Sequence, residues 1–277
     1  MPSDTAVIMA AHNAERTIRP AVVSVLDGTL PCDLFIADDA SRIPVEHALG
    51  ALAERVTVIR LDKNAGPGGA RNAALAHVLA GDYKYVAIMD ADDISHPTRL
   101  AVQRAFLENH PEVGVVGTWV RLFDERTGET VYSLHRASAS DSIRKLMYFN
   151  IGLSHATAMM RVKTLREVGL YDPSFAAAED YELMRRIGTR YDFANIPEDL
   201  LSYRISPGGQ SRGRRMRQLY DRLRTQLRYF EPLQWRAWAG VLKTLLVMLV
   251  PSGWAEPLKI KSRGLVTPGA AFPANKS

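Results

Sequence analysis

The sequence contains a single cysteine, Cys32, among its 277 residues. One thiol excludes an intrachain disulfide, and with it the small disulfide-stapled scaffolds of secreted proteins. A secretory signal, with positive charge followed by an apolar run and small residues, is not found after Met1. Both observations predict a protein of the reducing cytoplasm.

Long apolar segments and common nucleotide loops are also missing. The nearly apolar stretch WRAWAGVLKTLLVMLVP contains Lys243 and stops at Pro251, so it falls short of the roughly 20 residues that a spanning helix needs. The chain has no G-x-G-x-x-G dinucleotide fingerprint and no G-x-x-x-x-G-K-[ST] phosphate loop. A membrane-spanning protein, a dinucleotide oxidoreductase and a P-loop enzyme are therefore not predicted.

Positive charge is concentrated in one part of the chain. Residues 204–263 hold an excess of ten positive charges, which exceeds the net charge of +5 and leaves the remainder acidic. From Met216 to Phe230, apolar residues recur at helical spacing between arginines, the pattern of a basic amphipathic helix. With the tryptophan-flanked stretch that follows, 214–254 is predicted to lie in a membrane interface. Packing on the catalytic domain or on a second subunit is the alternative, and a nucleic-acid partner is not expected because no binding motif accompanies the charge.

Strands alternate with helices over the first ninety residues. Apolar runs that read as strands each stop at polar residues and are followed by a helical pattern; the strands are expected at 5–11, 32–38, 55–62 and 83–90. This alternation predicts an α/β fold, with a mostly parallel sheet covered by helices on both faces.

A polar cluster follows each of these four strands. Asp90, Asp92 and Asp93 come after the fourth strand, and carboxylates two residues apart can share one Mg²⁺ or Mn²⁺ ion with phosphate oxygens. The alternative for Asp93 is a cap on a helix that begins near Ser95. Because ligands bind outside the carboxyl ends of strands in open α/β sheets, the four clusters are expected to share one rim.

Two other clusters permit two interpretations each. The segment NAGPGGARN places three glycines and Arg71 where a strand leads into a helix, which favours an anion, although a tight turn would explain the glycines equally well. Asp38 and Asp39 are either simple turn formers or acceptors for a base or a ribose.

Five segments in this order carry a family resemblance: VIMAAHNAE, FIADDAS, NAGPGGARN, IMDADD and AAEDYEL. Together they closely resemble the inverting glycosyltransferases of family 2, which have the Rossmann-like GT-A fold, over roughly Thr5 to Tyr203. The resemblance implies a catalytic domain at 1–210, with a nucleotide-binding half at about 1–95 and an acceptor-binding half at about 96–210. A helical tail is expected at 211–262, and 263–277 is expected to be disordered.

The resemblance also implies roles for individual residues. The donor nucleotide would be bound by the loops after the first three strands, through Ala10, His12, Glu15, Asp39, Asn64, Gly66 and Arg71. Asp90 would contact the ribose and Asp92 would hold the divalent ion. His12 stands where the family has another residue type; it can still stack on a base, or it is a partly buried loop histidine.

The remaining implied roles concern chemistry and the acceptor. Asp180, with Glu179 beside it, matches the pair whose aspartate is the general base, although both could simply be acids at a helix N-terminus. His155 would lie on the acceptor side of the cleft or serve as a structural histidine. Arg204, Ser206 and Gln210 match a segment that closes over the diphosphate in many relatives.

The function expected from the sequence is metal-dependent, inverting transfer of a sugar from a nucleotide-diphosphate sugar to a hydroxyl of a saccharide or lipid-linked acceptor. A UDP-sugar is the favoured donor, with dTDP- and GDP-sugars open, and bacterial surface polysaccharide synthesis on the cytoplasmic face of the inner membrane is the expected setting. Two alternatives remain: a sugar-phosphate nucleotidylyltransferase, whose glycine-rich basic opening loop is missing from AAHNAE, and a non-catalytic nucleotide-binding scaffold.

Overall fold

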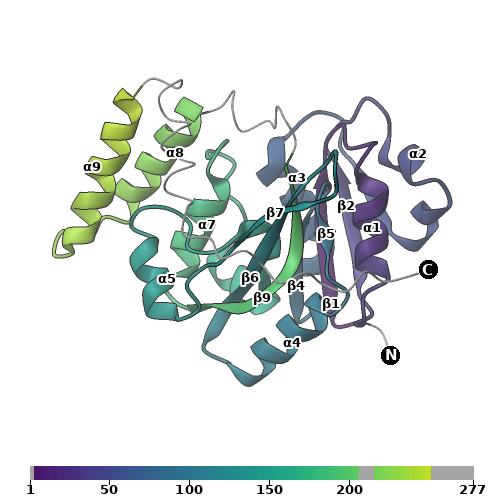
Figure 1. Cartoon of the computed structure of the whole chain (residues 1–277), viewed down its shortest axis with the longest axis horizontal. Helices are drawn as coiled ribbons and strands as arrows, with labels where there is room; N and C mark the ends of the chain where they lie inside the picture. The colour runs from purple at the N-terminus through teal and green to yellow at the C-terminus, as the bar shows by residue number, and fades with distance from the viewer. Residues whose placement is uncertain (1–2, 206–214, 251–277) are drawn as a thin grey trace.

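The computed structural model describes residues 3–205 and 215–250. In this part of the chain one mixed sheet runs in the order β3-β2-β1-β4-β8-β6-β9-β5, with β7 paired to β6 (Figure 1). Its strands are β1 (Thr5–Ala11), β2 (Asp33–Asp38), β3 (Thr57–Arg60), β4 (Tyr85–Asp90), β5 (Ile94–Ser95), β6 (Val113–Asp124), β7 (Thr130–Leu134), β8 (Met159–Arg161) and β9 (Asp192–Ile205). The predicted 263–277 segment, Ser206 and Gln210 lie outside the described residues.

Helices cover both faces of the sheet and extend beyond it at one end (Figure 1). They are α1 (Ile18–Leu26), α2 (Val45–Leu49), α3 (Gly66–Ala80), α4 (Arg99–Asn109), α5 (Ser140–Leu146), α6 (Val162–Val168), α7 (Glu179–Ile187), α8 (Arg215–Arg228) and α9 (Trp235–Leu249), with short 3₁₀ turns at Gly50–Arg55 and His155–Thr157. This arrangement confirms the predicted α/β class.

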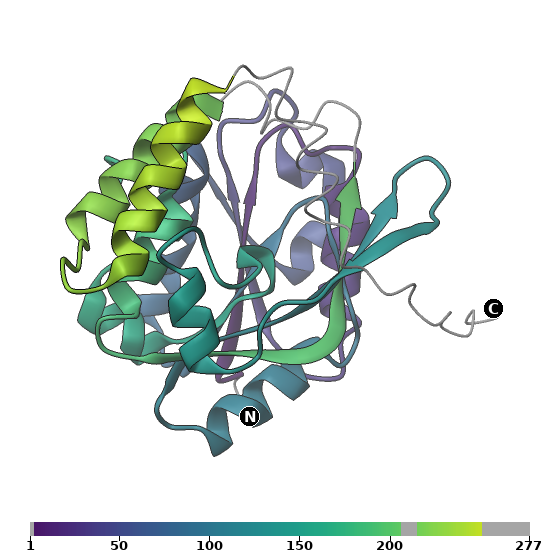
Figure 2. The ribbon, with the colours of Figure 1, turned by 60° about the vertical axis from the view of Figure 1, so that its left-hand side comes forward.

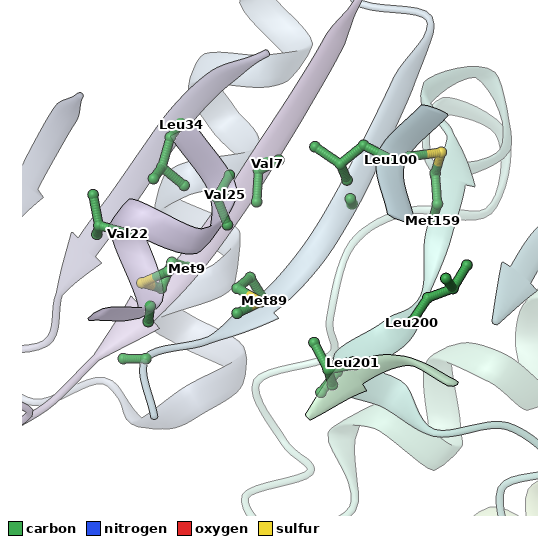
Figure 3. Close-up of a cluster of buried hydrophobic side chains, with 14 of the residues drawn as sticks. Val7, Met9, Val22, Val25, Leu34, Met89, Leu100, Met159, Leu200 and Leu201 are labelled. Atoms are coloured by element: carbon green, nitrogen blue, oxygen red, sulfur yellow. The ribbon is translucent and has the colours of Figure 1, made fainter. Parts of the chain in front are cut away.

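The sheet is buried on both faces because successive strand residues point to opposite sides. On β1, Val7 and Met9 pack with Val22 and Val25 of α1 in one core cluster (Figure 3). Ile8 faces the other way, into a second cluster that contains buried apolar residues of α3, α6 and α7. Because both faces of β1 are buried, its sequence is an unbroken apolar run rather than an alternation of apolar and polar residues.

The two halves of the sheet differ in strand direction. Strands β3, β2, β1 and β4 run parallel, as the sequence predicts. Beyond them β8 is antiparallel to both β4 and β6, β9 is parallel to β6, and β5 and β7 pair antiparallel with β9 and β6. The mostly parallel prediction therefore describes the first half, and the second half is mixed.

Helices α8 and α9 pack together as a hairpin at one end of the molecule (Figure 2), with α8 also against α7. The contact surface of α8 is mostly polar: Asp221, Thr225 and Gln226 are buried together with one apolar residue, Leu219. Gly240 of α9 approaches the core so closely that a Cβ there would lie 2.0 Å from the carbonyl oxygen of Tyr148. The hairpin therefore docks mainly through polar and small residues, with Leu219 as the large apolar contribution.

Most large apolar residues of the hairpin are exposed instead. The exposed large side chains are Met216, Tyr220, Leu227, Leu233, Trp235, Trp238, Leu242, Leu245, Leu246 and Leu249. Within residues 3–205 and 215–250, no helix has both the length and the apolar character needed to cross a bilayer.

Candidate active site

The carboxyl ends of three parallel strands meet at one edge of the sheet. The register places Ala11 of β1 beside Asp38 of β2, and half-buried Ala10 beside Asp90 of β4. The loops that follow these strands therefore begin at the same level. Three of the polar clusters expected from the sequence are brought together at this edge.

Asp39 fastens this edge to the start of α3. Its buried carboxylate accepts hydrogen bonds from the backbone N–H of Ala65, at 2.6 Å, and of Gly66, at 3.0 Å. Gly66 has φ +74°, in the left-handed region that favours glycine, and its N–H also reaches Asn64 Oδ1 at 3.2 Å. Asp39 thus shapes the glycine-rich loop. Its carboxylate has further lone pairs that could accept hydrogen bonds from a base, and that contact stays a prediction.

Asp38, by contrast, is a structural residue. Its fully buried carboxylate accepts hydrogen bonds from the backbone N–H of Ser41, at 2.9 Å, and of Val45, at 3.2 Å, and pairs with Arg60. Burial by itself would raise the pKa of Asp38, but these hydrogen bonds and the Arg60 guanidinium outweigh it and lower the pKa. The turn-forming interpretation is the one that the structure supports for Asp38.

The loop after β1 is joined to the loop after β2 through His12. Its Nδ1 lies 2.7 Å from the carbonyl oxygen of Asp39, so Nδ1 carries the proton and donates, and Nε2 accepts from Asn13 Nδ2 at 3.0 Å. Glu15 lies 3.9 Å from Arg42. His12 is half-buried, and the proposed contacts of His12 and Glu15 with the base stay predictions.

Arg71 connects three elements of the site. From the first turns of α3 it donates to Asp90 Oδ1 at the end of β4, at 2.9 Å, and to Glu179 Oε1 at the start of α7, at 3.2 Å. Its side chain is only 9% exposed. Burial by itself would lower the pKa of this guanidinium, but Asp90, Tyr171 and Glu179 raise it well above its usual value. Arg71 is a permanently charged bridge between the end of β4 and the start of α7.

The glycine at position 68 allows this contact. A Cβ on Gly68 would lie 3.1 Å from Glu179 Cγ, closer than most side-chain contacts allow. The glycines of the NAGPGGARN segment thus serve two separate needs, a left-handed backbone at Gly66 and close approach at Gly68.

Glu179 and Asp180 open α7 at this junction. Burial raises the pKa of Glu179, the nearby Asp180 raises it further, and Arg71 opposes both effects. Asp180 is half-buried, and its Oδ1 accepts a hydrogen bond from the N–H of Tyr181 at 2.7 Å. Asp180 Oδ2 forms no hydrogen bond or ion pair with the described residues, which suits a group that receives a proton.

His155 and Tyr171 lie beside Arg71, whose guanidinium carbon is 5.9 Å from the centre of the Tyr171 ring. Their Nε2 and phenolic oxygen lie 2.9 Å apart, and the Asn72 side chain holds the Tyr171 backbone through bonds of 2.8 and 3.0 Å. Burial, helped by the Arg71 charge, lowers the pKa of His155 to about 4, while Asp180 and Asp90 oppose the shift. His155 is therefore a neutral imidazole at physiological pH, and it lies within electrostatic range of both sets of carboxylates.

Asp92 and Asp93 have separate environments. Asp92 is exposed, and its pKa is raised by partial desolvation and by the charge of Asp90. Asp93 is fully buried; desolvation, Asp90 and Asp92 raise its pKa to about 9. The structure rules out Asp93 as a helix cap, because α4 begins at Arg99 with Thr98 before it.

The segment 90–93, called the acidic loop below, has positively charged partners within the protein. Buried Arg99 interacts electrostatically with Asp93. Arg204 donates its backbone N–H to Asp93 Oδ1 at 3.1 Å and its Nε to the Asp92 carbonyl at 2.8 Å. Arg204, which was expected to face the diphosphate, here fixes the acidic loop, and its contact with substrate stays a prediction.

The acidic loop suits a divalent ion that is held jointly with a ligand. Among the described residues no group of three or more His, Cys, Asp or Glu side chains could hold a metal. Asp92 forms no ion pair in that part of the chain, and its charge is destabilised by Asp90. A cation would relieve this repulsion, and Mg²⁺ commonly uses one or two carboxylates together with substrate phosphates. The residues present therefore fit such an ion.

Two residues of the site are not identifiable from the sequence. Tyr171 lies in no recognisable pattern, and only the structure places its hydroxyl on His155. Arg222 of α8, which lies within electrostatic range of Asp180, is in the sequence one of several arginines of a basic helix. For Asn72 a signal exists, because it ends the NAGPGGARN segment.

A separate cavity of about 600 Å³ lies at the other end of α7. It is formed by α5, the end of α7 and the turn between α8 and α9, and its lining includes Arg144, Arg185 and Tyr229. Because Glu179 and Asp180 stand at the start of α7, this cavity is distinct from the carboxylate cluster.

The chain is similar to known proteins in both sequence and structure. The model of the family described as Glycosyl transferase family 2 matches residues 6–169. The uncharacterized glycosyltransferase MJ1057 of Methanocaldococcus jannaschii is 29% identical over 206 residues, 72% of this chain and 70% of that protein. The amylovoran biosynthesis glycosyltransferase AmsE of Erwinia amylovora is 29% identical over 208 residues, 72% of this chain and 75% of that protein.

Solved structures share the fold at low sequence identity. S. aureus TarS 1–349 in complex with UDP-GlcNAc has a TM-score of 0.68 and 16% identity, over 95% of this chain and 78% of that one. The mannosyltransferase PcManGT from Pyrobaculum calidifontis, in complex with GDP-Man and Mn²⁺, has a TM-score of 0.65 and 17% identity, over 95% of this chain and 76% of that one. These similarities identify the GT-A architecture.

Proposed function

The chain belongs to glycosyl transferase family 2 and is a transferase, and from that premise we propose that it moves a sugar from a nucleotide-diphosphate sugar to a hydroxyl group with inversion. The observation that carries the proposal is the Arg71 bridge. It joins the acidic loop after β4, where a donor diphosphate would lie, to the carboxylate pair of α7. Residues separated by as many as 108 positions in the chain are thereby gathered around one centre.

The donor is proposed to bind along the edge formed by β1, β2 and β4, with Asp92 and Asp90 holding Mg²⁺ or Mn²⁺. When bound, such an ion neutralises charge on the diphosphate leaving group. The relatives support a nucleotide sugar, since TarS is described with UDP-GlcNAc and PcManGT with GDP-Man and Mn²⁺. We favour a UDP-sugar as donor.

The side chains divide the chemistry among them. Asp180 accepts the proton of the acceptor hydroxyl while that oxygen attacks the anomeric carbon and the bond from that carbon to the diphosphate oxygen breaks. Arg71 offers a permanent positive charge to the departing diphosphate. Glu179 holds Arg71 in place, and the neutral imidazole of His155 contributes a hydrogen-bonding group without adding charge beside the base. One displacement of this kind inverts the anomeric configuration.

The acceptor is proposed to be a saccharide or a lipid-linked saccharide in bacterial surface polysaccharide synthesis. AmsE, which is 29% identical, is described as an amylovoran biosynthesis enzyme. The outward apolar side chains of α8 and α9 support peripheral contact with the cytoplasmic face of the inner membrane, because amphipathic helices with tryptophans and arginines favour the lipid interface. Contiguous exposed apolar patches commonly mark interaction sites, which supports this contact.

The test is release of nucleoside diphosphate from a panel of nucleotide sugars, with and without Mn²⁺, in the presence of lipid extract. Asp180→Asn should lower transfer by at least a hundred-fold, which is within the range that a general base contributes, and leave UDP affinity within about two-fold. Asp141→Asn, at an exposed acid of α5, is the matched control and should behave as wild type. Normal turnover by Asp180→Asn would refute the base assignment.

A further inference from the structure

The cavity of about 600 Å³ at the end of α7, called the α7 cavity below, lies away from the carboxylate cluster. Arg185, which lines it, follows Asp180 by five residues on the same helix. At 3.6 residues per turn the two side chains are about 140° apart around the helix axis, so they leave α7 on different sides. The other walls, α5 and the turn between α8 and α9, lie at the end of the molecule remote from β1, β2 and β4 (Figure 1). A ligand in the α7 cavity would therefore not occupy the donor edge.

The lining of the α7 cavity has an excess of positive charge, with four basic side chains and two acidic ones. Arg144 and Lys145 each pair with an aspartate, and Arg144 also donates to two backbone carbonyl oxygens. Arg236 differs, because it forms no ion pair or hydrogen bond with residues 3–205 and 215–250. Its guanidinium carbon lies 4.7 Å from the ring centre of the adjacent Trp235. The α7 cavity therefore offers a positive charge that no carboxylate of the described residues neutralises.

Arg185 is the buried cation of the α7 cavity. Its side chain is 10% exposed, and its guanidinium carbon lies 5.0 Å from the ring centre of Tyr148 and 5.8 Å from that of Tyr229. One terminal nitrogen, Nη2, donates to the Tyr229 carbonyl at 2.8 Å and lies 3.5 Å from Glu231 Oε1. The other, Nη1, forms no hydrogen bond with the described part of the chain. Because Glu231 is 52% exposed, solvent screens this one ion pair, and the guanidinium keeps donors for a second anion.

The size and the surfaces of the α7 cavity favour a ligand that has a ring as well as a charge. A volume of about 600 Å³ lies in the range of small-molecule sites and is more than a simple anion fills. Tyr148, Tyr229 and Phe230 supply ring surfaces, while Glu231 and Gln234 supply hydrogen-bonding groups. A purely apolar ligand would leave those polar groups without partners. A saccharide suits both kinds of surface, because its ring has apolar C–H faces and carries hydroxyl groups at its edge.

We propose that the α7 cavity is an accessory site for a negatively charged sugar unit, whose carboxylate or phosphate is bound by Arg236 and Arg185. Arginine suits this role because its planar guanidinium donates to two oxygens of such a group at once. The choice of a sugar as the ligand rests on the proposed function, which brings glycans to this protein, whereas the charge of the ligand follows from the lining alone. Binding here holds the protein on an acidic glycan without taking part in the transfer.

The experiment measures dissociation constants for the full-length protein by calorimetric titration, with and without saturating UDP and Mg²⁺. The probes are glucuronate, glucose 6-phosphate, glucose as the uncharged sugar, and inorganic phosphate as a charge without a sugar. At least one of the charged sugars should bind about five-fold or more tighter than glucose and inorganic phosphate do. Arg236→Gln should weaken that binding about ten-fold, the size of a lost charge-assisted contact. Arg126→Gln, which removes an arginine that is 74% exposed on the β6–β7 turn, should stay within about two-fold of wild type.

The fold should survive the test substitution. Arg236 has no ion pair to lose within the described residues, so the melting temperature of Arg236→Gln should stay within about 2 °C of wild type. A loss of sugar binding in this variant then reports on the ligand contact and not on unfolding.

The outcomes separate the alternatives. Tighter binding of glucuronate indicates an acidic sugar and tighter binding of glucose 6-phosphate indicates a sugar phosphate, and either result supports the site. The proposal is overturned if neither charged sugar binds, if glucose or inorganic phosphate binds as tightly as both, or if Arg236→Gln binds as wild type does. It is also overturned if UDP displaces the charged sugar, since the ligand would then lie at the donor edge. Absence of nucleoside diphosphate release from every nucleotide sugar, with the dependence on Arg236 intact, would instead refute the proposed function and leave the anion site standing.

Discussion

Replacing Arg71 with methionine should destabilise the fold by about 3 kcal/mol, because it strips two carboxylates of their shared partner. The main contribution comes from Glu179, since that side chain is 11% exposed and Arg71 is 9% exposed. Asp90 is 30% exposed, so solvent screening limits its contribution to under about 1 kcal/mol.

The loss should depend on pH in a defined direction. The pKa of Glu179 is already raised by burial and by Asp180, and Arg71 is the charge that holds it down. Without Arg71 the folded-state pKa rises further above the unfolded value, so the folded state takes up a proton more readily than the unfolded state. Stability is then gained as pH falls through that folded pKa, and the deficit of Arg71→Met should be larger at pH 8 than at pH 5.

Urea unfolding of four proteins tests this reasoning: wild type, Arg71→Met, Arg71→Met with Glu179→Gln, and Arg166→Met as an exposed-arginine control. The double variant should recover about half of the lost stability, because an amide can be buried at lower cost than an unpaired carboxylate. The control should stay within about 0.5 kcal/mol of wild type. An Arg71→Met protein as stable as wild type, or no recovery in the double variant, would refute the reasoning.

Two further predictions concern the acceptor side and the helical hairpin. In the unfolded chain the imidazole of His155 takes up a proton near the ordinary histidine pKa of 6.5, and in the folded protein only near 4. The unfolding free energy of wild type should therefore fall by up to about 3 kcal/mol as pH drops through that window. Urea unfolding at several pH values should show a smaller fall for His155→Gln, and an equal fall in both proteins would count against the assignment. Replacing exposed Leu242 and Leu246 of α9 with serine should reduce co-sedimentation with anionic liposomes at least ten-fold. The melting temperature should stay within about 2 °C of wild type, because these side chains lie outside the core. Undiminished sedimentation would exclude α9 as the lipid contact.

The sequence by itself determined the local elements. Apolar runs that end in polar residues located the first four strands, and β1 at Thr5–Ala11 has the predicted bounds. These features depend on the local sequence and not on distant partners. A strand is indicated by its own apolar pattern, and the glycine at position 66 is required by the left-handed backbone conformation at that residue. The order of the five segments was sufficient to indicate the family.

Only the tertiary structure decided which side chains meet and which surfaces are buried. Arg71 could have paired with any of several carboxylates, and its contact with Glu179 depends on how α7 packs 108 residues further along the chain. Helical periodicity located the faces of α8 without showing that its polar face, with Asp221, is the one buried. The same holds for Arg222, since a charged residue on a helix has no local signature that tells whether its partner is solvent, protein or ligand. Pairing and burial are properties of the packed chain, and for that reason the strands followed from the sequence while the partners in the site did not.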